Sequence, residues 1–286
     1  MKTLIFFHIN KTAGTTLREI LRRKFPVDSK ATVHDVDELL AIPKEERSNI
    51  QYLEGHFIFG LHEYLSQPST YITILRDPVS RVISEYYYLI SMLDDPRYAE
   101  RIGKNTTLEE YSKQGMWYSW NHQTASICGI GKGFPPPYGP VPLSAKDLGV
   151  AQENLRKHFM FVGLTERFDE SLVLLKRTLG WKIKDIIYLK ENVGRIRPPR
   201  DGISRETLKM IQQHNELDTE LYEFAKQMFE EQISQQDSSF RREVQLLRLI
   251  NRLPHESIRK GLNLLRAILK RERPVRDIFI TSRKVP

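Results

Sequence analysis

The sequence predicts an α/β fold in which a central parallel sheet is flanked by helices and followed by a helical C-terminal tail. Three apolar runs of strand character each precede an amphipathic helical segment: residues 3–8 before 15–25, 70–77 before 79–93, and 158–166 before 168–181. Repeated strand–loop–helix units favour a parallel sheet with helices on its faces. A chain of 286 residues is long enough for one large domain of this class.

The first unit opens with the apolar run TLIFFH, which is typical of a buried strand, and continues through the turn-like segment NKTAG. In the helix that follows, apolar residues recur on one face. Thr15 or Thr16 is the expected N-cap, and Pro26 ends the helix. The stretch from Pro26 to Asn49 is expected to be helical in part.

The second and third units repeat this order. The run TYITILRD is β-branched and apolar, and Pro78 follows it at a first-turn position, where a missing N–H costs least. The run HFMFVGLTE predicts the third strand. Residues 115–149 contain GIGKGFPPPYGP, which predicts a long surface loop. Residues 203–233 predict helix, with a start between Ser204 and Thr207.

Positive charge is concentrated in the tail. The chain has a formal net charge of +8, yet residues 240–286 alone carry 13 basic and 4 acidic residues, so the rest is nearly neutral. We divide the chain into a domain of residues 1–235 and a basic amphipathic extension of residues 236–286, in which Pro254 separates two helices. A nucleic-acid-binding protein more often spreads charge over its folded face, so we expect no nucleic-acid partner. Solvated helix faces, peripheral membrane contact and dimerisation remain open for the tail.

Composition excludes several classes of protein. The single cysteine, Cys128, cannot form an intramolecular disulfide or a cysteine-only metal cluster, and it favours a reducing compartment. No apolar run approaches the roughly 20 residues of a membrane span. The opening MKTLIFFHINK lacks the pattern of a secretory signal. We therefore expect a cytoplasmic protein, with membrane association as an open alternative.

The segment HINKTAGTT has the properties of a phosphate-binding loop between a strand and a helix. Gly14 permits close approach of an oxyanion to the backbone, and the free N–H groups and dipole of the next helix favour negative charge. Lys11 adds a mobile cation, and Thr15 and Thr16 add hydroxyl donors. The Lys precedes the Gly, so this is not a Walker A motif. An ordinary strand–helix turn with a surface Lys is the alternative reading.

HINKTAGTTL resembles the 5′-phosphosulfate loop of sulfotransferases that use 3′-phosphoadenosine 5′-phosphosulfate, most closely the branch of heparan sulfate 2-O-sulfotransferases and bacterial carbohydrate sulfotransferases. ILRDPVSRVISEYYYL is similar to the family's 3′-phosphate element, and EGHFIFGLH lies where the family carries a catalytic His. WNHQTA, FVGLTERFDESL and NELDTELYEFA follow in the expected order. The resemblance spans residues 2–233 and implies a P-loop-like three-layer fold.

The resemblance implies roles for two sets of donor-binding residues. The first set would hold the 5′-phosphosulfate through backbone N–H groups, hydroxyls and one ammonium: Lys11, Thr12, Ala13, Gly14, Thr15 and Thr16. The second set, Arg76 and Ser84, would clamp the 3′-phosphate. A late basic loop covers the nucleotide in the family, so Arg195 and Arg197 join this set, with exposed loop charge as the alternative. Adenine is expected near Thr165 and Glu166.

The catalytic residues implied are His56, Lys11 and Glu54. Lys11 would neutralise the leaving phosphate, and His56 would take the proton of the acceptor hydroxyl, since an imidazole titrates near neutral pH. The 2-O-sulfotransferase pattern has a second His where this chain has Glu54. Glu54 could orient His56 or act as the base itself. Sulfuryl transfer resembles phosphoryl transfer in relying on positioning and electrostatics, and it requires no metal.

The acceptor site is the least determined. Family members face their acceptors with the region that here contains Trp117, Tyr118, Trp120, Asn121, His122 and Gln123. These aromatic residues would stack on sugar rings or bury a helix. We expect sulfuryl transfer to a hydroxyl of a carbohydrate, glycoconjugate, glycolipid or small metabolite. A P-loop kinase or nucleotide hydrolase and a peripheral membrane or scaffold protein are the alternatives.

Overall fold

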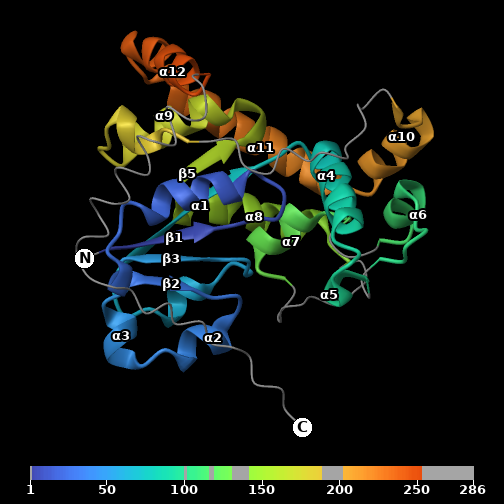
Figure 1. Ribbon diagram of the computed structural model, residues 1–286, viewed down its shortest axis with the longest axis horizontal. Helices are drawn as coiled ribbons and strands as arrows, with labels where there is room; N and C mark the ends of the chain where they lie inside the picture. Colours follow the sequence, from blue (N-terminus) through green and yellow to red (C-terminus); the bar gives the residue numbers. More distant parts are fainter. Residues whose placement is uncertain (1, 100–101, 116–118, 131–141, 189–201, 253–286) are drawn as a thin grey trace.

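A five-stranded, all-parallel sheet organises the chain in the computed structural model, which describes residues 2–99, 102–115, 119–130, 142–188 and 202–252. Its order is β2–β3–β1–β4–β5 (Figure 1). The strands are β1 (Thr3–Phe7), β2 (Lys30–Thr32), β3 (Tyr52–Gly55), β4 (Ser69–Leu75) and β5 (Phe159–Leu164). The predicted α/β class with a parallel central sheet is confirmed. The chain leaves β1 for the β2 edge, returns to β3 and crosses to β4, so its direction reverses beside β1.

Helices cover the sheet and extend beyond it. They are α1 (Gly14–Arg22), α2 (Val36–Ala41), α3 (Lys44–Ser48), α4 (Pro78–Ser91), α5 (Pro96–Ala99), α6 (Leu108–Lys113), α7 (His122–Cys128), α8 (Ala145–His158), α9 (Phe168–Thr178), α10 (Arg205–Gln213), α11 (Glu216–Ser234) and α12 (Ser239–Ile250). Figure 1 shows α2 and α3 beside the β2 edge, α12 beyond the β5 edge, and α4, α6 and α10 grouped at one side. No described helix has the length and apolar character needed to cross a bilayer.

The strands are buried because helices pack against the sheet. All five residues of β1 are buried, as the apolar run predicts for a central strand of a parallel sheet. The main core joins the sheet with α1, α8, α9, α11 and α12. A second apolar cluster fills the space between α4, α6 and α10 and includes Val82, Tyr111 and Ile211. The second cluster supports the long helix α4, which begins directly after β4.

Two strands were not predicted from the sequence. β2 has three residues and β3 has four, with a buried Glu54 in β3. Such segments are too short to show a periodic pattern, and a charged residue argues against a buried strand. They form strands because β1 offers β3 a parallel partner and β3 then offers one to β2.

Three local predictions were wrong in detail. The N-cap of α1 is Ala13 in the left-handed conformation, with no side-chain cap, so neither Thr15 nor Thr16 caps this helix. The stretch 115–149 is not one loop, because α7 and the start of α8 lie within it. The helix expected at 203–233 has its N-cap at Ser204 as predicted, but it is two helices, because α10 ends at Gln213 and α11 begins at Glu216 with Asn215 as its N-cap.

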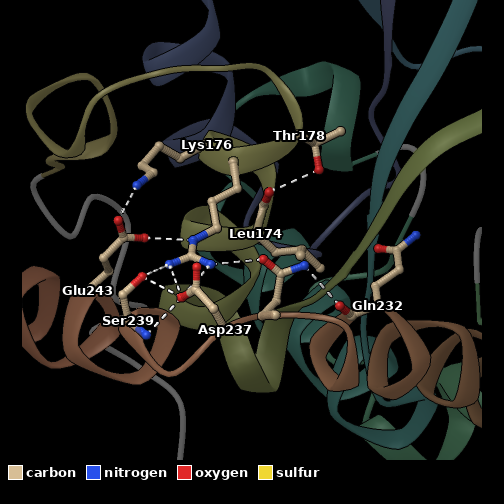
Figure 2. A network of polar contacts seen from close by, with 9 residues as sticks. Leu174, Lys176, Thr178, Gln232, Asp237, Ser239 and Glu243 are labelled. Carbon is tan, nitrogen blue, oxygen red and sulfur yellow. Dashed lines mark hydrogen bonds and ion pairs between the residues drawn. The ribbon is translucent and has the colours of Figure 1, made fainter.

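The first helix of the basic extension, α12, is tied to α9. Arg177 Nε donates to Glu243 Oε2 at 2.9 Å, and Lys176 Nζ donates to Glu243 Oε1 at 2.7 Å. Figure 2 shows Glu243 facing α9 and Ser239 and Asp237 beside it at the start of α12. On α12, Phe240, Val244 and Leu247 are buried. The expected second tail helix after Pro254 lies outside the described residues, and the division at 235 stays a prediction.

Candidate functional site

The candidate site lies at the carboxyl edge of the sheet, where four neighbouring strands end. His56 follows β3, His8 follows β1, Arg76 follows β4, and Thr165 follows β5. Ligands of open α/β sheets bind at this edge, where the direction of chain winding reverses. Here the reversal falls beside β1. Side chains from the three predicted motifs are therefore brought to one place by strand order, although they lie far apart in the sequence.

The loop between β1 and α1 brings the N-terminus of α1 to this edge, and no side chain of the described residues caps it by a hydrogen bond. Lys11 and Ala13 both have positive φ angles, of 66° and 64°, and Thr12 Oγ1 donates to the Ile9 carbonyl at 2.9 Å. The first turn of α1 has neither a side-chain cap nor an acidic residue. Helix N-termini of this kind attract anions because their N–H groups and dipole are uncompensated. Thr15 and Thr16 are half-buried in this turn, whereas Thr12 is buried and faces inward.

Gly14 is required by the position of His8. A Cβ atom at Gly14 would lie 1.9 Å from both Cδ2 and Nε2 of His8. The His8 ring stacks on Phe6 with a centroid distance of 5.2 Å and an interplanar angle of 13°. It also lies 4.2 Å, centroid to centroid, from the ring of His56. The glycine therefore admits the His8 ring into the space beside His56.

Lys11 has its ammonium within the site. Its Nζ lies 3.8 Å from the centroid of the Tyr88 ring, on α4. Burial lowers the pKa of Lys11 and the charge of Arg76 lowers it further, whereas the charge of Glu85 opposes the shift. A desolvated cation is a strong electrostatic partner for a phosphate or sulfate oxygen, because little water screens it. The predicted role of Lys11 is thus compatible with its surroundings.

Arg76 is held by contacts from three directions. Its Nη1 donates to the Lys11 carbonyl at 2.8 Å, which joins the end of β4 to the loop after β1. Gln123 is fully buried, accepts from the Arg76 N–H at 3.0 Å and donates to the Arg76 carbonyl at 2.9 Å. Glu166 Oε1 lies 4.0 Å from Arg76 Nε and accepts from the Asp77 N–H. The guanidinium is consequently aimed by neighbours before any ligand binds.

His56 is oriented as a neutral base. Its Nδ1 lies 2.7 Å from the His8 carbonyl oxygen. A carbonyl oxygen only accepts, so Nδ1 carries the proton and Nε2 keeps its lone pair. Burial lowers the pKa of His56 to about 4, and the charges of His34, Arg18 and Lys11 act in the same direction. At neutral pH the ring is uncharged and can receive a proton at Nε2.

Glu54 is hydrogen-bonded to other side chains and does not orient His56 as the sequence suggested it could. Its carboxylate is 1% exposed and accepts from Tyr52 Oη at 2.6 Å, Arg22 Nε at 2.5 Å and Thr32 Oγ1 at 3.2 Å. These bonds engage both oxygens of Glu54. The orienting bond to His56 comes from the His8 carbonyl instead.

The predicted acceptor residues are brought together at the start of α7. The Asn121 side chain accepts from the N–H of Asp218 in α11, and the Asp218 carboxylate accepts from Thr124 N–H at 2.7 Å and from Gln123 N–H at 3.1 Å. The two helices therefore cap each other, which explains why NELDTELYEFA accompanies WNHQTA. These contacts give Asn121 and Gln123 positioning roles. Whether either also contacts an acceptor stays a prediction.

Two other predicted acceptor residues lie close by. Trp120 stacks on His214 at a centroid distance of 4.1 Å and donates from Nε1 to the Ser112 carbonyl. Burial lowers the pKa of His122 well below its usual range, and the charges of Arg81 and His56 add to this effect. Both side chains are thus partly buried against the helical part, and a role of either in contacting an acceptor stays a prediction. Trp117 and Tyr118 lie outside the described residues, as do Arg195 and Arg197.

A buried ion pair supports the site and was not identified as such from sequence. Arg81 is fully buried on α4, and its Nη1 lies 3.9 Å from Glu85 Oε2, one turn later. The charge of Arg81 also acts on Asp218, where it opposes the rise in pKa that burial causes. The spacing of four residues on one helix was the available signal. Ser84, on the same helix, is half-buried and makes no hydrogen bond to any described residue.

Comparison with known proteins agrees with the resemblance to sulfotransferases seen in the sequence. The family model for galactose-3-O-sulfotransferases matches residues 1–276, beyond the end of the resemblance seen at residue 233. The chain is 29% identical over 245 residues to galactosylceramide sulfotransferase of Bos taurus, which covers 77% of this chain and 55% of the relative. It is 28% identical over 240 residues to galactose-3-O-sulfotransferase 3 of Homo sapiens, covering 77% and 54%.

A third relative agrees with these two. Galactose-3-O-sulfotransferase 2 of Homo sapiens is 24% identical over 256 residues, covering 77% of this chain and 58% of the relative. The chain spans about half the length of the curated relatives it matches. These relatives support the predicted resemblance to sulfotransferases, but they do not support the narrower branch of heparan sulfate 2-O-sulfotransferases.

Proposed function

The chain belongs to the galactose-3-O-sulfotransferase family, and from this premise we propose that it transfers a sulfuryl group from 3′-phosphoadenosine 5′-phosphosulfate to a hydroxyl of a galactose-containing glycoconjugate. One observation carries the proposal. His56, neutral and held through Nδ1 by the His8 carbonyl at 2.7 Å, stands next to the uncapped N-terminus of α1 and to Lys11. A base, an anion site and a desolvated cation are the groups this reaction needs.

The residues present fit the donor. The N–H groups at the start of α1, with Thr15 and Thr16, suit a 5′-phosphosulfate, because no side chain of the described residues caps that helix end by a hydrogen bond. Arg76 suits the 3′-phosphate, since a guanidinium binds phosphate oxygens in pairs. Ser84 is a half-buried hydroxyl two turns into α4 and remains a candidate for the same group. When bound, the donor supplies the activated sulfuryl group.

His56 and Lys11 would act on opposite sides of the transferred sulfuryl group, on the acceptor and on the leaving phosphate. As the acceptor oxygen bonds to sulfur, His56 Nε2 receives the hydroxyl proton, and Nδ1 stays bonded to the His8 carbonyl. As the bond from sulfur to the 5′-phosphate oxygen breaks, Lys11 stabilises the charge that develops on the leaving phosphate. We assign the base to His56 rather than Glu54, because the Glu54 oxygens are committed to Tyr52 and Arg22.

The acceptor class rests on the family and its named members. Relatives named for galactosylceramide and for galactose favour a galactose hydroxyl on a glycolipid or oligosaccharide. We accordingly place galactose ahead of a heparan sulfate residue, the acceptor of the branch favoured by sequence resemblance.

The test is a transfer assay with lactose and galactosylceramide as acceptors, combined with calorimetric binding of 3′-phosphoadenosine 5′-phosphate. We expect His56→Ala to lower turnover about 10²–10⁴-fold and to leave nucleotide affinity nearly unchanged. Glu54→Gln should retain turnover at a level set by its effect on stability. Loss of transfer in Glu54→Gln with retention in His56→Ala would move the base to Glu54. Binding of ATP with Mg²⁺ in place of the 3′-phosphorylated nucleotide would favour the kinase alternative.

A further inference from the structure

Two arginines lie on α1 and a third caps its C-terminus, and one of the three forms no hydrogen bond or ion pair with a described residue. Arg22 donates to Glu54 and Thr32, and Arg23 donates to the carbonyls of Asp185 and Ile187. Arg18 makes no hydrogen bond and no ion pair with any residue in the described ranges. Its Nε is buried, with no acceptor within reach. A buried guanidinium nitrogen left without an acceptor is costly unless a ligand supplies one.

The spacing along α1 shows where Arg18 lies. Residues four apart share one helix face, so Gly14, Arg18 and Arg22 form a row. Gly14 abuts the His8 ring, and Arg22 reaches Glu54. Arg18 stands midway in that row, and long helical side chains lean toward the helix N-terminus, which here is the edge of the sheet.

The neighbours of this row agree with that placement. His56 is two residues beyond Glu54 and so points to the same face of the β3 segment. The charge of Arg18 lowers the pKa of both His56 and His8, which requires proximity to both rings. The Arg18 guanidinium therefore lies on the β3 side of β1, with the base. Arg76, the predicted 3′-phosphate ligand, follows β4 on the other side of β1.

We propose that Arg18 binds an anionic group of the acceptor, a carboxylate or sulfate ester on the sugar linked to the galactose, and thereby makes an acidic galactoside the preferred substrate. This inference rests on the proposed function. An arginine presents paired donors that match planar carboxylates and sulfate oxygens. The Glu54 carboxylate, which belongs to the same strand segment as His56, is already bonded to Arg22. The donor phosphates have their own cations in Lys11 and Arg76.

The experiment compares two acceptors that differ in one group: galactosyl-β-glucose and galactosyl-β-glucuronate, with the 6-O-sulfated disaccharide as a second anionic probe. The full chain should use at least one anionic acceptor with a kcat/KM tenfold or more above the neutral one. Arg18→Gln should remove that preference through KM, and Arg18→Lys should restore part of it. Arg241→Gln, at an exposed arginine on α12, is the matched control and should keep the preference.

Each outcome is decisive. Equal use of neutral and anionic acceptors by the full chain would overturn the inference. A uniform fall in kcat for both acceptors in Arg18→Gln would also overturn it, and would place Arg18 on the transferred sulfuryl group. Binding of 3′-phosphoadenosine 5′-phosphate checks that each variant is folded. If the unaltered chain neither binds this nucleotide nor sulfates any acceptor, the proposed function itself has failed.

Discussion

Replacing Gly14 by alanine isolates the steric requirement at the centre of the site. Gly14 does not have a positive φ, so alanine suits its backbone, and alanine would improve the intrinsic stability of the helix by up to about 1 kcal/mol. The obstacle is the added Cβ, which would lie 1.9 Å from two atoms of the His8 ring. That ring cannot turn freely because it stacks on Phe6 and lies beside His56. The added Cβ can therefore fit only if the helix backbone or the His8 ring shifts.

The expected cost follows from these contacts. Overpacking a filled site typically costs about 1–3 kcal/mol, which the helix propensity of alanine offsets in part. We expect the free energy of unfolding of Gly14→Ala to fall by about 1–2 kcal/mol. The rate of sulfuryl transfer should fall by a larger fraction than the free energy of unfolding. Displacing His8 shifts the carbonyl that holds His56 Nδ1, and a misplacement of about 1 Å can lower a rate on the order of 10²-fold.

The assay is urea denaturation for stability and initial-rate sulfation for activity, on Gly14→Ala, His8→Ala and the double variant. Removing the His8 ring removes the clash, so Gly14→Ala should cost little stability in the His8→Ala background. The coupling free energy should fall in the range of about 0.5–3 kcal/mol. Strictly additive effects, or wild-type activity in Gly14→Ala, would refute the steric reasoning.

Three further perturbations test other parts of the molecule. Gln123→Leu leaves the N–H and carbonyl of Arg76 without partners, so we expect about 1–3 kcal/mol of lost stability and weaker calorimetric binding of 3′-phosphoadenosine 5′-phosphate; unchanged affinity would contradict this. The pKa of His56 in the folded state, about 4, lies below the unfolded value, so the unfolded chain binds the proton more tightly. Stability should therefore decline as pH falls from about 6.5 toward 4, by at most about 1.4 kcal/mol per pH unit from this residue, and His56→Gln should show a shallower decline in urea melts. Arg177→Ala removes bonds to Glu243 and Ser239, so amide exchange should accelerate across α12 and not in α1, whereas uniform acceleration would indicate global destabilisation.

Much of the fold follows from local patterns. The runs that became β1, β4 and β5 are long or apolar enough to be recognised, and Pro78 at the start of α4 and Ser204 before α10 marked helix starts correctly. The short strands β2 and β3 lack such a pattern, because only pairing with β1 makes them strands. The local sequence also could not show that residues 203–233 form two helices rather than one. The break at Asn215 depends on its side chain bonding to Ser119 and to Ile211 in the folded chain.

The sequence by itself determined which reactive groups this protein carries: a Lys-first loop of the kind expected to bind phosphate, an Arg after a buried strand, and a His after a Gly. These features depend only on residue type and short spacing. Tertiary structure decided the surroundings and hydrogen-bond partners of each group. Strand order brought the His8 carbonyl against His56, which set the proton on Nδ1, and burial of the ring lowered its pKa. It also engaged Glu54 with Arg22 while leaving the buried Nε of Arg18 without an acceptor among the described residues. Hydrogen-bond partners and burial arise between distant segments, so no local pattern could reveal them.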